Sequence, residues 1–146
     1  MLLLRDLAHQ APLRLAAGAF VLNSGLEKRG ADEVTAKGYH GQAATAYPFL
    51  GEMEPRRFLS LLSSAEIAVG SVLLFPLVPE GLAGLALTGF AAGLVGFYLR
   101  TPGLRRKGSL RPTDQGIPLA KDSWLLGIGL SLLADDLVRN MYRLRR

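Results

Sequence analysis

The segment from Gly81 to Leu99 contains no charged residue, and this feature constrains the fold more than any other. Helical residues rise about 1.5 Å each, so a run of roughly 20 residues crosses a hydrocarbon core of about 30 Å. A helix on the surface of a water-soluble protein would carry a polar stripe, which this segment lacks. The sequence therefore predicts a transmembrane helix at about 81–99.

Three further apolar segments accompany this one. The segment at about 12–28 is interrupted by Arg14 and Asn23, and the segment at about 58–78 contains one acidic residue, Glu66. The last segment, at about 118–138, carries its charged residues near its two ends. Together the four segments predict an all-α fold, an integral membrane four-helix bundle that forms a single membrane domain over residues 1–146.

Two of the connecting segments are too long to be simple turns. Residues 29–57 are mildly amphipathic, with Val34, Tyr39 and Tyr47 as anchors, which predicts an interfacial helix on the membrane surface between the first and second spans. Residues 100–116 form a basic loop rich in Gly and Pro. The positive-inside rule favours cytoplasmic connections only weakly, so the orientation stays open.

The first apolar segment differs from a secretory signal peptide. It lacks a basic start followed by a compact apolar core, and it also lacks a small-x-small cleavage site. Three more spans follow it. We therefore expect no cleaved signal peptide. The expected location is a membrane, where the chain would be a multi-pass protein surrounded by the lipid bilayer.

The composition excludes several kinds of chemistry. The chain has no Cys, which rules out disulfides and thiolate metal sites. Its two His residues, His9 and His40, supply too few ligands for a metal or haem site, so we expect no metal and no intrinsic cofactor. The formal net charge of +5 comes from basic residues between apolar segments. Membrane topology and anionic lipid explain those residues, so no nucleic-acid partner is expected.

Chain direction predicts which polar residues lie at the same end of the bundle. The first and third spans end at the face that carries the long connections, and the second and fourth begin there. Glu66 is expected roughly 16 Å below that face. Its carboxylate must face the bundle interior, because a charge in the hydrocarbon core costs about 2.5–3.5 kcal/mol. The predicted polar pocket comprises Asn23, Glu27, Lys28, Glu66, Lys121 and Asp122.

Two interpretations of this cluster stay open. Glu66 either hydrogen-bonds to neighbouring helices as a buried structural residue, or lines a cavity for a small polar or quinone-like head group. A proton relay has less support, because no chain of further carboxylates is visible within the spans. Lys28, Lys121 and Asp122 are either interfacial anchors and helix caps or the rim of a head-group site.

A second set of polar residues belongs to the opposite end of the bundle. There we expect structural intramembrane ion pairs among Arg14, Asp135, Asp136 and Arg139. The third span also carries rows of small residues, which either set close helix packing within the bundle or form a dimer face. The glycines concerned are Gly84, Gly89 and Gly93.

One combination of these residues points to a known family. The pattern consists of an early Arg14, the spacing Gly18-x-x-x-x-x-x-Gly25-x-x-Lys28, Glu66 in the second span, and Lys121-Asp122 before a Gly-rich fourth span. It resembles the DoxX-like family of small four-helix bacterial membrane proteins, in an actinobacterial branch. The extended loop with Gly-Tyr-His-Gly-Gln departs from the short connections common in that family. The resemblance implies a location in the bacterial plasma membrane and a link to thiosulfate:quinone oxidoreduction or other membrane redox assemblies, without an established catalytic residue.

The functional hypotheses follow from this limited chemistry. The first is a non-catalytic accessory or scaffold subunit of a cell-envelope complex, with a respiratory or redox complex as one candidate. Its partners would be other membrane proteins or further copies of the chain. The alternative is a quinone- or lipid-binding DoxX-like redox protein with a polar intramembrane pocket. If the chain is an enzyme, it would be a quinone-linked oxidoreductase component. A channel or transporter has less support, because no polar track crosses the bundle.

Overall fold

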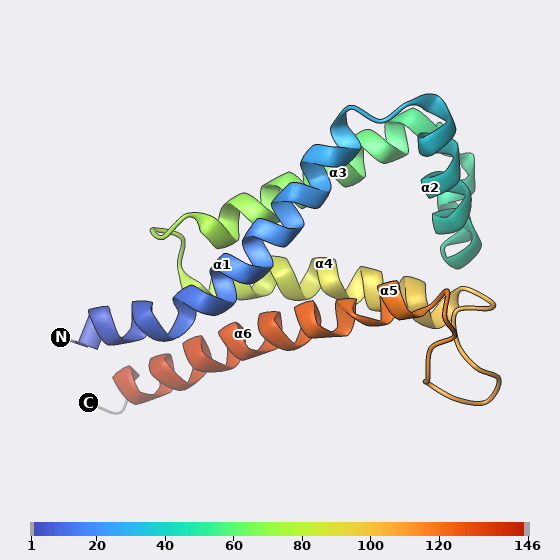
Figure 1. The fold of residues 1–146 in the computed structure, drawn as a ribbon. Coiled ribbons are helices and arrows are strands. Elements are labelled where there is room, and N and C mark those ends of the chain that lie inside the picture. The colour runs from blue at the N-terminus through green and yellow to red at the C-terminus, as the bar shows by residue number, and fades with distance from the viewer. Residues whose placement is uncertain (1, 145–146) are drawn as a thin grey trace.

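Two antiparallel pairs of long helices form the body of the protein (Figure 1). The computed structural model describes residues 2–144, with side chains from residue 8 onward. Helix α1 (Leu2–Arg29) packs along α3 (Pro55–Leu74), and α4 (Glu80–Arg100) packs along α6 (Asp122–Leu144). Both chain ends lie at one end of the molecule. The all-α prediction is confirmed over the described residues, whose only β-type pairing is an isolated bridge between Arg105 and Pro112.

The two helix pairs diverge toward the end opposite the termini (Figure 1). At that end lie α2 (Glu33–Ala46), the short 3-10 helix η1 (Pro48–Glu52) and the one-turn helix α5 (Ile117–Ala120). Contacts of α2 with both α3 and α4 connect the two pairs. The segment predicted to be interfacial, 29–57, therefore includes a helix that lies against the body of the protein.

Local capping sets the start of two helices. Asp32 precedes α2 and accepts a hydrogen bond from the backbone N–H of Thr35 at 2.8 Å. Glu54 precedes α3, and its carboxylate accepts hydrogen bonds from the backbone N–H groups of Arg56 and Arg57, both at 2.9 Å. These two bonds hold the pKa of Glu54 below its ordinary value of 4.5. They stabilise the start of α3 at Pro55, just before the predicted apolar span at about 58–78.

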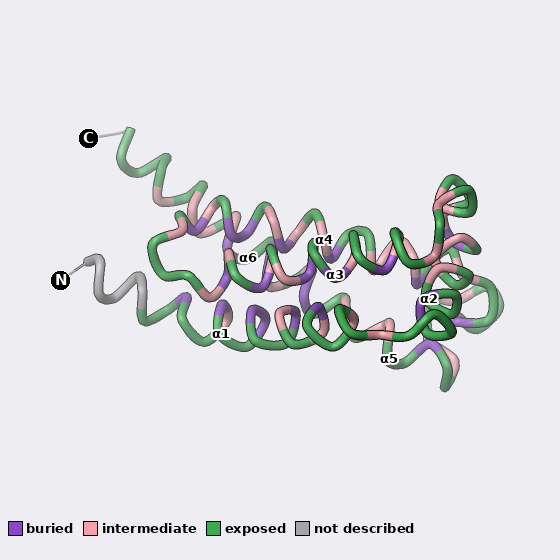
Figure 2. The backbone as a smooth tube through the Cα atoms, turned by 90° about the horizontal axis from the view of Figure 1, so that it is seen from above, coloured by how far each residue is buried: buried purple, intermediate pink, exposed green. Residues whose placement is uncertain are grey.

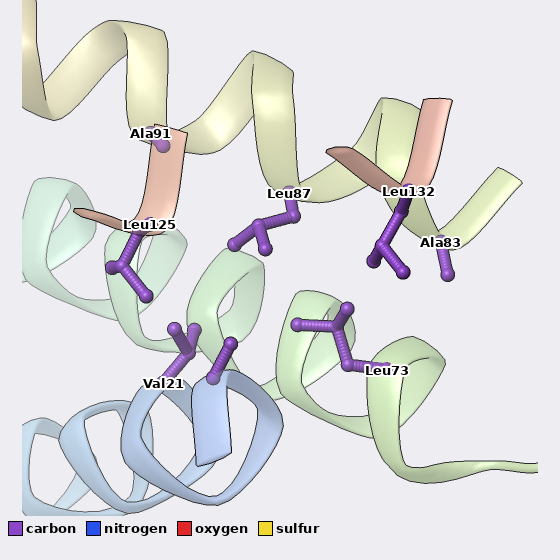
Figure 3. Packing of buried hydrophobic residues seen from close by; sticks show 8 residues of the cluster. Val21, Leu73, Ala83, Leu87, Ala91, Leu125 and Leu132 are labelled. Atoms are coloured by element: carbon purple, nitrogen blue, oxygen red, sulfur yellow. The ribbon is translucent and has the colours of Figure 1, made fainter. Parts of the chain in front are cut away.

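The apolar core lies where the four long helices meet (Figure 3). Leu73, Leu87 and Leu132 have at most 1% of their surface exposed, and they come from α3, α4 and α6. Val21 adds the contribution of α1, also at 1%. Buried residues follow the inward faces of these helices, while their outward faces are exposed (Figure 2). The core therefore joins the two helix pairs into one unit.

Among the described residues, three helices are long and apolar enough to cross a membrane: Pro55–Leu74, Glu80–Arg100 and the continuous stretch Ile117–Leu144. Their outward faces expose large apolar side chains, such as Leu61, Leu85 and Leu130, each at least half exposed. Contact with lipid tails is favourable for such apolar surfaces, whereas contact with water is not. The predicted fourth span at 12–28 lies within α1, where Arg14 and Asn23 lower the apolar character.

The basic loop 100–116 has a defined structure. The Tyr98 hydroxyl donates to the carbonyl oxygen of Leu110 at 2.7 Å, and Arg105 Nη2 donates to that of Leu99 at 2.7 Å. Thr113 Oγ1 donates to the carbonyl oxygen of Gly103, also at 2.7 Å. These bonds close the loop over the end of α4, so α6 begins next to the point where α4 ends.

Candidate functional site

A cavity of about 490 Å³ lies between the two helix pairs. Residues of every helix contribute to its wall. Most of the wall is apolar and aromatic, including Phe20, Phe58, Phe90, Phe97 and Leu125. A volume of this size lies within the range of cavities that hold small organic ligands, about 300–1,000 Å³. The cavity is therefore large enough for a ligand with an extended apolar body.

A hydrogen-bonded cluster interrupts the apolar wall where α1 faces α3. Lys28 Nζ lies 3.1 Å from both carboxylate oxygens of Glu66, and it donates a hydrogen bond to Oε1. The ammonium group also donates to the hydroxyl oxygen of Ser24 at 2.6 Å and to its backbone carbonyl oxygen at 3.3 Å. The Ser24 hydroxyl in turn donates to Glu66 Oε1 at 3.3 Å. The side chains of Lys28 and Glu66 are 10% and 6% exposed, so this ion pair is held inside the protein.

Close approach of α1 and α3 brings this pair together. A Cβ atom on Gly25 would lie 2.9 Å from Glu66 Cβ and 2.9 Å from the backbone nitrogen of Ile67. Only glycine leaves room for that approach. Ser63 Oγ also donates to the carbonyl oxygen of Gly25 at 2.8 Å, in a buried position. Backbone packing beside Gly25 thus fixes the position of the Glu66 carboxylate relative to Lys28.

Asp122, the first residue of α6, adds a second carboxylate to the cavity wall. It is half-buried, and no described residue donates a hydrogen bond to its side chain. The charged lining residues of the cavity are thus one ammonium group and two carboxyl groups.

Helix α2 and the residue after it supply the remaining polar lining, with Tyr39, Gln42 and Tyr47. The Lys28 ammonium lies 5.2 Å from the centroid of the Tyr39 ring. The Tyr47 hydroxyl donates to the carbonyl oxygen of Gly93 at 2.7 Å, which ties the end of α2 to α4. These contacts hold α2 across one side of the cavity.

The other members of the predicted pocket lie outside this cavity. Asn23 Nδ2 donates to Glu27 Oε1 at 3.0 Å, and both residues are on the exposed face of α1. Lys121 is exposed as well. The structure therefore brings together Lys28, Glu66 and Asp122, and leaves Asn23, Glu27 and Lys121 at the surface.

At the opposite end, Arg14 interacts with backbone carbonyl oxygens at the end of α3. Its guanidinium donates to Leu73 at 2.8 Å and to Phe75 at 2.8 Å. Two more bonds go to Val72 at 3.1 Å and to Val78 at 3.0 Å. Carbonyl groups at a helix C-terminus have no partner within the helix, and the cation supplies one. Arg14 thus caps α3 from a neighbouring helix.

The remaining predicted ion-pair residues lie near the start of α4. Arg139 pairs with Glu80, a residue that the sequence analysis did not select and that is 6% exposed. Asp136 accepts a hydrogen bond from Asn140 at 3.1 Å, and Asp135 lies 3.8 Å from His9. The contacts of Arg139 and Asp135 join α6 to the N-terminal parts of α4 and α1, whereas the bond between Asn140 and Asp136 lies within α6.

The glycines of α4 occupy two different environments. A Cβ atom on Gly84 would lie 2.9 Å from the backbone nitrogen of Leu133 and 3.0 Å from Leu132 Cβ, so Gly84 lets α4 and α6 approach each other. A Cβ atom on Gly89 or on Gly93 would have no other atom within 4 Å, and both glycines line the cavity. Gly84 is therefore a packing residue, whereas Gly89 and Gly93 keep the cavity wall open.

Ser24 and Gln42 are pocket residues that the sequence analysis missed. Ser24 precedes Lys28 by one helical turn, a spacing that places both on one helix face and that the sequence could have revealed. No comparable signal marks Gln42, because its position depends on how α2 packs.

Among residues 2–144, no cluster of three or more His, Cys, Asp or Glu side chains is arranged to hold a metal ion. Compared with known proteins, the chain matches no family model, no curated protein and no solved structure. Its own cavity and polar cluster are therefore the basis for a functional proposal.

Proposed function

We propose that the protein is an integral membrane protein that binds an amphiphilic molecule of the bilayer. The apolar body of the ligand would occupy the aromatic-lined cavity, and its polar head would meet Lys28, Glu66 and Asp122. The observation that carries this proposal is the presence of a buried charged cluster in the wall of an otherwise apolar cavity of about 490 Å³. Membrane quinones and lipids are the ligand classes with this division between apolar body and polar head.

The proposal includes α1 as the fourth span of a membrane four-helix bundle. The two basic side chains within the proposed span 12–28 are directed into the protein: Arg14 binds the carbonyl groups that end α3, and Lys28 binds Glu66. Asn23 and Glu27 are exposed and hydrogen-bond to each other in the last turns of α1. Intramembrane charges are tolerated when they are paired inside a bundle. Internal pairing therefore offsets the lower apolar character of α1.

The resemblance to the DoxX-like family is consistent with this proposal. The positions that carry it include Lys28, Glu66 and Asp122, which share the cavity wall, and Arg14, which caps α3. We propose membership of that family, location in the bacterial plasma membrane and a quinone as one candidate ligand. The accessory-subunit hypothesis stays a prediction. The cavity favours a binding function over a purely structural one, and no catalytic step is proposed.

The test is to identify what the cavity holds and to block it. The protein is extracted gently in native lipid discs, and the molecules that co-purify are measured by mass spectrometry. Gly89→Leu adds a side chain to the cavity wall without a clash at Cβ. Gly127→Leu is the matched control, because Gly127 is a helical glycine with equal space at Cβ and lies outside the cavity wall.

We expect one amphiphile at stoichiometric level in the wild type and in Gly127→Leu. Gly89→Leu should lose it by at least about tenfold, which corresponds to roughly 1.4 kcal/mol of binding free energy. Equal amounts of the same molecule in Gly89→Leu and Gly127→Leu would show that the cavity is not the binding site.

A further inference from the structure

The ammonium group of Lys28 has no hydrogen left for a ligand. A lysine side chain carries three N–H donors. Here they meet three acceptors within the protein: the Ser24 carbonyl oxygen, the Ser24 hydroxyl oxygen and Glu66 Oε1. The hydroxyl hydrogen of Ser24 is directed at Glu66 Oε1 as well. An acceptor-only head group would have to break one of these contacts before it could bind Lys28.

Two carboxylate groups at the cavity wall, in contrast, have hydrogen-bond acceptor atoms without a donor. Glu66 Oε2 is buried and lacks a hydrogen-bond partner among the described residues, although it lies 3.1 Å from the Lys28 ammonium. The Asp122 carboxyl group has no hydrogen-bond donor within the described part of the chain. A buried acceptor without a donor is unfavourable, because it has lost its hydrogen bonds to water. A ligand that donates a hydrogen bond to the Asp122 carboxyl group, which lines the cavity, would give that group a partner.

Charge leads to the same conclusion. One ammonium group faces two carboxyl groups in a wall that is otherwise apolar, aromatic or uncharged. A carboxylate or phosphate head would add another negative charge beside two carboxyl groups, in surroundings that screen charge poorly. A hydroxyl group adds no charge, and a protonated amine balances the excess of acid over base.

We infer that the head group bound in this cavity is a hydrogen-bond donor, either a hydroxyl or a protonated amine, and that anionic head groups are rejected. The inference rests on the proposed function, since it names the chemistry of the ligand in the same cavity. If the ligand is a quinone, it binds here as the hydroxyl-bearing reduced form.

The experiment compares probes that share one alkyl chain and differ only in the head. Protein in nanodiscs is held on scintillation beads with radiolabelled dodecanol, and unlabelled dodecanol, dodecylamine, dodecyl methyl ether and dodecanoate compete with it. The ether is the matched control for the alcohol, because it accepts hydrogen bonds but donates none. Only the signal lost in Gly89→Leu counts as binding in the cavity.

We expect dodecanol or protonated dodecylamine to compete at least about tenfold better than the ether, with dodecanoate the weakest. The order of the first two identifies a hydroxyl or an amine as the preferred head. Asp122→Asn, which breaks no hydrogen bond within the described residues, should weaken dodecylamine more than dodecanol. Asp114→Asn, at an exposed loop position, should change neither.

Two results would overturn the inference in different ways. If the ether or dodecanoate competes as well as dodecanol, and binding still depends on Gly89, the donor requirement is wrong while the proposed function stands. If no probe binds in a Gly89-dependent manner, the proposed function fails together with the inference.

Discussion

Replacement of Arg14 tests how the helix pair α1 and α3 is held together. Its guanidinium donates four hydrogen bonds to carbonyl oxygens at the end of α3 and in the turn that follows. Arg14→Met keeps an unbranched apolar stem of similar length but removes every donor. Arg14→Lys keeps the charge but replaces the planar fork of five N–H groups with three donors on one atom.

The expected loss can be worked out from these contacts. The bond to Leu73 is buried, so removing its donor leaves an unpaired acceptor at a cost of about 1–3 kcal/mol. The other three bonds are partly buried, and water can replace the donor in part, so each contributes about 0.5–1 kcal/mol. Arg14→Met should therefore destabilise the fold by about 2.5–6 kcal/mol. Arg14→Lys should lose roughly half of that, because one ammonium cannot reach all four carbonyl groups.

The assay is reversible unfolding by SDS in mixed micelles, followed by far-ultraviolet circular dichroism. Arg57→Met is the control, because Arg57 is exposed and its side chain makes no hydrogen bond to the described residues. That substitution should change the free energy of unfolding by less than about 0.5 kcal/mol. A midpoint for Arg14→Met equal to that of Arg57→Met would refute the capping role of Arg14.

Three further predictions concern other parts of the molecule. Gly70→Ala should destabilise the fold by about 1–3 kcal/mol in the same SDS assay, because its Cβ atom would lie 2.6 Å from the backbone nitrogen of Leu22; an unchanged midpoint would contradict this contact. Glu54→Ala should lower the SDS midpoint at neutral pH. The folded-state pKa of Glu54 lies below its ordinary value of 4.5. Its contribution to stability is therefore fully present above about pH 5 and is lost as the pH falls through the folded-state pKa. A midpoint difference between wild type and Glu54→Ala that persists at lower pH would argue against the cap. If α1 crosses the membrane, single cysteines at His9 and Lys37 should react with an impermeant thiol reagent from opposite sides of vesicles, and labelling from one side would exclude that span.

The helical class was predictable because its signals are local. The uncharged run 81–99 lies inside α4, and Pro55 and Pro76 mark where α3 begins and ends in the structure. The length of α1 was not predictable from apolarity, since that helix begins well before residue 12. The first part of α1 contains polar residues, so a prediction from apolar runs alone places the start of the helix too late.

The cavity shows where reasoning from chain direction reaches its limit. Direction alone places Lys28 and Glu66 at one end of the bundle, and in the structure they are 3.1 Å apart. It does not say which face of a helix turns inward. Asn23 and Glu27 lie four residues apart on one face of α1 and are exposed, while Ser24 and Lys28 lie four residues apart on the next face and line the cavity. Packing against α3 through Gly25 decides between these faces, and that packing is not local.

The distribution of side-chain size along the bundle explains why a cavity exists at all. At the end near the termini, Leu73, Leu87 and Leu132 fill the space between the helix pairs. Toward the other end, α4 presents Gly89 and Gly93, and neither has a neighbour that would occupy the space beside it. Interiors normally pack at high density, so an opening of this size requires support around its rim. The hydrogen bond from Tyr47 to Gly93 supplies that support, because it fixes the end of α2 against α4 while the cavity between them stays open.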